Sequence, residues 1–153
     1  MPVPHEGITD FWLQYWELAT EEVPSLRMQR PAVRGGRSTW IHFRDALQRR
    51  PSLAPVVLVH KLEKGQVQLV FPGWGGRMEL LARAIRDTGS DFEVWPAQKS
   101  AAVAILVPAV DPAGNFSDQV AGVRTGLAAA VRLQEWWSLY WRNVLELVAA
   151  EVS

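Results

Sequence analysis

The chain has 153 residues, a length typical of one domain that can bury a continuous hydrophobic core. Its 16 basic and 16 acidic side chains balance and 48% of its residues are hydrophobic, which excludes a disordered chain and a polycation. No cysteine is present, which excludes a disulfide framework, a thiolate zinc site and cysteine catalysis.

The sequence also predicts the cellular location of the protein. Neither a signal-peptide pattern nor an apolar run of about 20 residues is present, so we expect a cytoplasmic protein with no membrane partner. Residues 1–153 contain no internal repeat, low-complexity tract or linker, which predicts a single domain.

The chain opens with a predicted helix. Apolar residues from Phe11 to Leu18 recur at the i, i+4, i+7 spacing of one helix face. Thr9 or Asp10 can cap this helix, and Pro24 ends it. The pattern predicts an amphipathic helix that covers a core with one face.

Three predicted strands follow. Residues 39–44 alternate between apolar and polar side chains, which predicts a strand whose Ile41 and Phe43 point to the core. Two apolar runs, 56–62 and 67–71, flank a short connection that contains glycine. This arrangement is typical of an antiparallel hairpin.

The second half predicts a helix, a strand pair and a long helix. Residues 77–87 carry a helical stripe that Gly89 ends, and residues 92–95 and 101–107 form an antiparallel pair. The segment of about 118–152 contains no proline and predicts a long C-terminal helix. The order of elements predicts an α+β fold, with a largely antiparallel sheet of about five strands and helices on one face.

The densest aromatic segment lies in this C-terminal helix. A helix over 118–152 would extend about 50 Å, farther than a domain of this size is wide, and its apolar residues cover two neighbouring stripes. Trp137 and Trp141 fall on the stripe expected to face the core, and Trp136 and Tyr140 on the stripe expected to meet a second copy. We predict a homodimer with these four aromatic residues as interface candidates; the alternative is burial of all four within the monomer.

A second candidate surface is basic. Seven arginines stand against one acid, Asp45, in 24 residues: Arg27, Arg30, Arg34, Arg37, Arg44, Arg49 and Arg50. Guanidinium groups bind phosphate bidentately, and Trp40 on the polar side of its strand could stack a base. The candidate contacts to nucleic acid or another anion are Arg27, Arg30, Arg34, Arg37, Trp40 and Arg44. The alternative is a solvated loop that Glu17, Glu21 and Glu22 balance.

The chemistry-bearing residues form no recognised catalytic constellation. His42 and His60 lie on neighbouring predicted strands and could face each other near Arg44, which is the basis for a small-molecule enzyme as a third hypothesis. Two histidines without a third ligand at suitable spacing do not predict a metal site. The turn at 73–77 precedes a helix, as phosphate-binding turns do, but matches neither glycine-rich nucleotide motif. We therefore predict no metal and no cofactor, and an interaction module rather than an enzyme.

Several landmarks together resemble a known type of bacterial domain. They are Phe11-Trp12-Leu13, Trp40-Ile41, the 67–71 strand leading into a glycine turn and a helix, and Phe92-Glu93-Val94-Trp95 with Lys99. Over most of residues 10–137 this pattern resembles an uncharacterised bacterial family that occurs alone or C-terminal to restriction-endonuclease-like nuclease domains. The resemblance implies a small α/β domain associated with nucleic-acid processing or defence, and it supplies no catalytic residues.

The chain departs from the nucleases themselves. A metal nuclease of the restriction type needs an Asp followed at a distance by Glu-x-Lys, whose carboxylates hold a hard cation. Glu63 and Lys64 are adjacent, and Glu93 lies six residues from Lys99, so neither pair has that spacing. If a nuclease is involved, we expect it to be another domain or a partner.

Overall fold

The fold is α+β, as predicted. The computed structural model describes residues 5–28, 30, 40–43, 46–47, 56–97 and 99–152. Within them the elements are α1 (His5–Glu22), the short 3-10 helix η1 (Pro24–Leu26), β1 (Trp40–His42), β2 (Val57–Lys61), β3 (Gln66–Pro72), α2 (Met78–Asp87), β4 (Glu93–Ala97), β5 (Ser100–Leu106) and α3 (Phe116–Val152). The predicted order of helices and strands is confirmed, and the first helix begins earlier than Thr9.

The five strands form one antiparallel sheet in the order β1-β2-β3-β5-β4. The β2–β3 hairpin is the predicted one, and its turn requires Gly65. This residue has φ +65°, and a Cβ there would lie 2.5 Å from the carbonyl oxygen of Val107. Glycine alone adopts that conformation without a steric penalty, so the chain can turn tightly while β5 continues alongside it.

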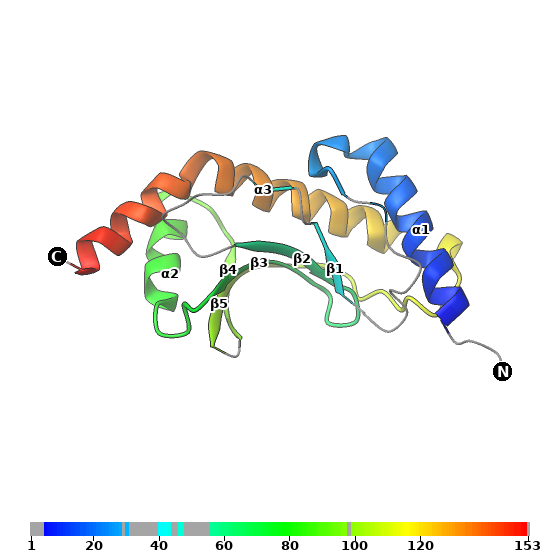
Figure 1. Cartoon of the computed structure of the whole chain (residues 1–153), viewed down its shortest axis with the longest axis horizontal. Coiled ribbons are helices and arrows are strands. Elements are labelled where there is room, and N and C mark those ends of the chain that lie inside the picture. The colour runs from blue at the N-terminus through cyan, green and yellow to red at the C-terminus, as the bar shows by residue number, and fades with distance from the viewer. Residues whose placement is uncertain are drawn as a thin grey trace.

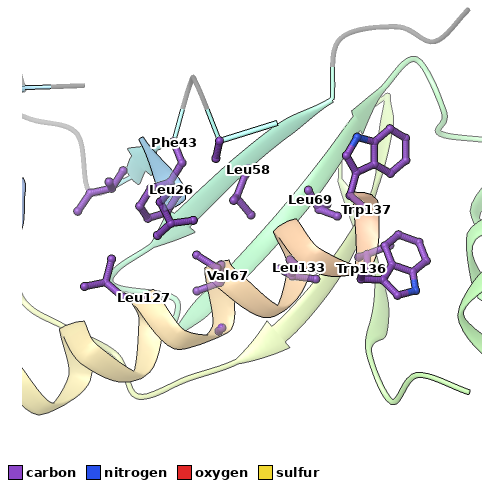
Figure 2. Close-up of a cluster of buried hydrophobic side chains, with 14 of the residues drawn as sticks. Leu26, Phe43, Leu58, Val67, Leu69, Leu127, Leu133, Trp136 and Trp137 are labelled. Atoms are coloured by element: carbon purple, nitrogen blue, oxygen red, sulfur yellow. The ribbon is translucent and has the colours of Figure 1, made fainter. Parts of the chain in front are cut away.

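The three helices lie on one side of the sheet (Figure 1), as predicted. Alternate strand residues face them and are buried: Ile41, Leu58, Leu62, Val67, Leu69, Phe71, Ala101 and Val103. From α1, the i, i+4, i+8 series Phe11, Tyr15 and Ala19 closes one end of this core. Figure 2 shows side chains of α3 lying over Leu58, Val67 and Leu69.

The 37 residues of α3 would span about 55 Å, so this helix is longer than the sheet beneath it. Figure 1 shows its C-terminal end passing beyond the strands, where α2 lies beneath it. There Val144 is fully buried, and Arg77 Nε lies 3.6 Å from Glu151 Oε2. The overhang expected from the sequence therefore exists, and α2 covers much of its apolar side.

The placement of Trp136 corrects the expectation from the sequence. Its side chain is 3% exposed, as is that of Trp137, and its indole N–H donates to Thr88 Oγ1 at 3.0 Å. Phe92 packs edge-on against the same ring. At Trp136, the stripe assigned to a second copy instead meets Thr88 and Phe92, which follow α2.

In the part of the chain that the structure describes, no helix is both long enough and apolar enough to cross a membrane.

Candidate functional site

The side of the sheet opposite the helices, which we call the helix-free face, is the main candidate surface. No described helix covers it, and Figure 1 shows the strands curved so that the concave side of the sheet backbone faces away from the helices. Strand register places these residues on it: Trp40, His42, Val57, Val59, Lys61, Gln66, Gln68, Val70, Glu93, Trp95, Ala102, Ala104 and Leu106. The face therefore mixes aromatic, aliphatic, amide and charged groups.

Two large apolar side chains stand exposed on this face. Trp40 is 39% exposed and Leu106 is 57% exposed. Register places both in one cross-strand row, Trp40, Lys61, Gln66 and Leu106, which spans about 14 Å at the usual strand spacing. The only other exposed large hydrophobic residue in the described chain is Leu139. The two exposed apolar groups therefore lie on either side of Lys61 and Gln66, at the end of the sheet near the β2–β3 turn.

Lys61 lies between these two apolar groups. Its side chain is 7% exposed, and its Nζ lies 4.1 Å from the centroid of the Trp40 ring. Burial, followed by the charge of nearby Lys64, lowers the pKa of Lys61. In the described chain no carboxylate lies within ion-pair distance of it. Lys61 was not among the residues singled out from the sequence, because its place on the face of Trp40 follows from the register of β1 against β2.

The other polar groups of the face bind one another. Gln68 is 3% exposed, and its Nε2 donates to Gln66 Oε1 at 2.5 Å. Its own Oε1 is enclosed and has no hydrogen-bond partner. At the β4 edge, Trp95 Nε1 donates to Glu93 Oε2 at 2.9 Å. Glu93 thus has a partner, whereas among the described residues the only attractive contact of the Lys61 ammonium is with the Trp40 ring.

The prediction that His42 and His60 face each other is wrong. Ile41 pairs with His60 and His42 pairs with Val59, so the two imidazoles point to opposite sides of the sheet. His42 is exposed on the helix-free face, and His60 is fully buried under the helices. A register displaced by one residue separates them, because side chains alternate along a strand.

His60 belongs to a buried polar pair in the core. The Tyr15 hydroxyl lies 2.7 Å from His60 Nδ1, while His60 Nε2 has no partner. Burial lowers the pKa of His60 to about 4 and raises that of Tyr15. The backbone of α3 lies directly above the imidazole at Gly126. The pair is therefore enclosed, and we infer that it helps to position α1 and α3 on the sheet.

The arginine-rich segment is described only in part. Arg27 and Arg30 are exposed, and the Arg30 guanidinium carbon lies 5.8 Å from the centroid of the Trp16 ring on α1. This places Arg30 on the helix side, whereas Trp40 points away from it. The remaining candidates lie outside the described residues: Arg34, Arg37, Arg44, Arg49 and Arg50. Nucleic-acid binding by this segment stays a prediction.

The glycine turn before α2 has a packing role. Gly73 has φ +81°, and the following Trp74 is 4% exposed with its ring 5.2 Å from that of Phe71. Arg77 lies over the Trp74 ring and pairs with Glu151. Trp74 and Arg77 of this turn are therefore engaged in contacts within the chain. In the described chain no group of three or more histidine or acidic side chains is arranged to hold a metal ion.

Of the four interface candidates on α3, only Tyr140 and Trp141 keep part of their side chains exposed. Trp136 and Trp137 are buried within the chain, Tyr140 and Trp141 are half-buried, and Leu139 is 71% exposed. Tyr140 stacks at a tilt on Trp136, with ring centroids 6.3 Å apart. The surface open to a second copy would thus consist of Leu139 and the outer edges of Tyr140 and Trp141.

Comparisons with protein-family models, with curated proteins and with solved structures gave no match. The resemblance to a nuclease-associated bacterial family therefore stays a prediction.

Proposed function

We propose that this protein is an interaction module that binds a partner protein through the helix-free face. The observation that carries this proposal is the row containing Trp40 and Leu106, both exposed on the side of the sheet that no described helix covers. Large apolar side chains exposed together mark interaction surfaces more often than isolated ones do. Tryptophan is also among the residues that contribute most to protein interfaces.

The size of the face predicts the strength of binding. Five strands at about 4.8 Å spacing and five residues at about 3.3 Å give roughly 400 Å², which is an upper limit because Val59, Gln68, Ala102 and Ala104 on this face are at most 3% exposed. A standard interface buries about 800 Å² on each partner. We therefore expect a transient complex unless the partner also contacts the rim of the sheet.

Substitution of Leu106 tests the proposal. Leu106→Glu places a charge on the face without altering a buried side chain, because Leu106 is 57% exposed. Leu139→Glu makes the same change on the outer side of α3, and serves as the matched control. Proteins retained from source-cell lysate by the immobilised wild-type chain should be lost with Leu106→Glu and kept with Leu139→Glu. Equal retention by both variants would refute the assignment of this face.

Self-association through the end of α3 is the second candidate. The exposure of Leu139 beside the half-buried Tyr140 and Trp141 favours it. Sedimentation equilibrium measures this directly: a dimer should weaken with Leu139→Glu and persist with Leu106→Glu. A monomer throughout the micromolar concentration range would remove this candidate and leave the helix-free face unaffected.

A further inference from the structure

We propose that the partner presents an acidic peptide segment to the helix-free face, with a carboxylate that pairs with Lys61 and apolar side chains that pack against Trp40 and Leu106. This inference rests on the proposed function and names the chemistry of its partner. The acidic character of the partner is inferred from the positions of the charged side chains on and beside the face.

The ammonium of Lys61 has no counterion among the described residues. Its side chain is 93% buried, since only 7% is exposed, yet no described carboxylate pairs with it and no described hydrogen bond engages it. Its Nζ is not among the described side-chain atoms that are both fully enclosed and without a hydrogen-bond partner, so the charged tip keeps some contact with solvent while the aliphatic stem is covered. A partly desolvated cation without a counterion costs free energy, and a carboxylate supplied by a partner would remove that cost.

Positive and negative charges lie at different ends of the face. Lys61 lies on β2, and Lys64 adds a second positive charge in the turn that follows. Glu93 lies on the opposite edge strand, β4, where Trp95 donates to it. The positive end coincides with the exposed Trp40 and Leu106. An acid flanked by apolar residues matches this end in both charge and hydropathy.

A peptide fits these observations better than a nucleic acid does. A single strand requires a series of cations along a groove and several aromatic rings. The described charges on the strands of this face are Lys61 and Glu93, one of each sign on different strands, so the face offers no series of cations. One carboxylate beside apolar groups needs only the one cation and the surfaces on either side of it.

The experiment begins with a phage-displayed library of random dodecapeptides selected on the folded chain. Enriched peptides are then synthesised with a fluorescent label, and their affinities are measured by anisotropy for the wild type and four variants. Lys61→Met keeps the buried stem and removes the charge, and Lys61→Arg restores the charge. Leu106→Glu tests the face itself. Arg83→Gln removes one exposed charge from α2, on the helix side, and is the matched control. Equal urea midpoints establish that the variants are folded.

The proposal expects enriched peptides with an acidic residue beside apolar ones. Their binding should weaken roughly tenfold with Lys61→Met, recover with Lys61→Arg and stay unchanged with Arg83→Gln. The chain has three lysines, so the NMR signal of the Lys61 side chain can be separated from those of Lys64 and Lys99. Binding should shift the Lys61 signal and leave the exposed Lys99 signal in place.

Three results would overturn the proposal in different ways. Peptides that lose binding with Leu106→Glu but bind Lys61→Met as tightly as wild type would refute the acidic partner and keep the proposed face. Peptides insensitive to Leu106→Glu, or none enriched, would refute both. A deoxythymidine dodecamer that binds in a Lys61-dependent manner and displaces the peptides would replace the acidic peptide with a nucleic acid.

Discussion

Substitution of Gly126 tests how α3 is seated on the sheet. A Cβ at this position would lie 2.2 Å from His60 Cε1, 2.7 Å from Nδ1 and 2.9 Å from Nε2. Because van der Waals contact requires at least about 3.4 Å, Gly126→Ala must displace the imidazole or lift the helix. Displacing the imidazole also breaks its 2.7 Å hydrogen bond with Tyr15.

The magnitude follows from three opposing effects. Overpacking a core costs about 1 to 3 kcal/mol, and the lost hydrogen bond about 1 kcal/mol. Alanine in place of glycine in a helix returns about 1 kcal/mol. We expect Gly126→Ala to lower the free energy of unfolding by about 1 to 3 kcal/mol. Gly122→Ala is the matched control on the same helix, because its Cβ would meet only Val110 Cγ2, at 2.9 Å, and should cost about 1 kcal/mol.

A double-mutant cycle separates the clash from other effects. In a His60→Ala background the imidazole is gone, so Gly126→Ala should become stabilising by about 1 kcal/mol through helix propensity alone. Urea unfolding at neutral pH, followed by far-UV circular dichroism, measures all four proteins. If Gly126→Ala costs the same with and without His60, the contact between them does not limit the position of α3.

Three further predictions concern the core. Burial lowers the pKa of His60 to about 4, below its ordinary value of 6.5. As pH falls, His60 is therefore protonated in the unfolded chain before it is protonated in the folded one. Stability should be complete above pH 6.5, fall by roughly 3 kcal/mol as pH drops towards 4 and level off below, and His60→Gln should flatten this part of a urea-midpoint profile. Gln134 Nε2 donates to the carbonyl oxygens of Ser25 at 2.7 Å and Ala46 at 2.8 Å, so Gln134→Leu should lower the unfolding free energy by about 2 kcal/mol in urea titration; an unchanged midpoint would show that both carbonyls find other donors. Trp136→Ala should cost about 3 to 5 kcal/mol in the same assay, and a variant that instead stays stable and only changes in mass by light scattering would return this residue to an interface.

The elements that sequence periodicity predicts well are those whose pattern is local. The β2–β3 hairpin shows this, because two apolar runs and a glycine turn specify it without reference to the rest of the chain. The α2 stripe and the proline-free run of α3 are local patterns of the same kind. Element types and their order therefore follow from the sequence, and with them the α+β class.

The features that sequence reasoning missed depend on relations between segments. Whether His42 meets His60 depends on the register of β1 against β2, and a displacement of one residue reverses the answer. The position of Lys61 against Trp40 depends on the same register. A single sequence shows which side chains share a strand face, but not which residue of the neighbouring strand stands opposite.

The aromatic excess of α3 has a different explanation from the one its composition favours. A helix that outruns its sheet needs a second element to cover its apolar side, and α2 lies in that position because the turn at Trp74 directs it back under α3. Trp136 and Val144 then become core residues of the α2–α3 pair. All three helices are used on one side of the sheet, and no described helix remains for the other. The same packing that buries these tryptophans thus leaves Trp40 and Leu106 exposed on the opposite side of the sheet, where we propose that a partner binds.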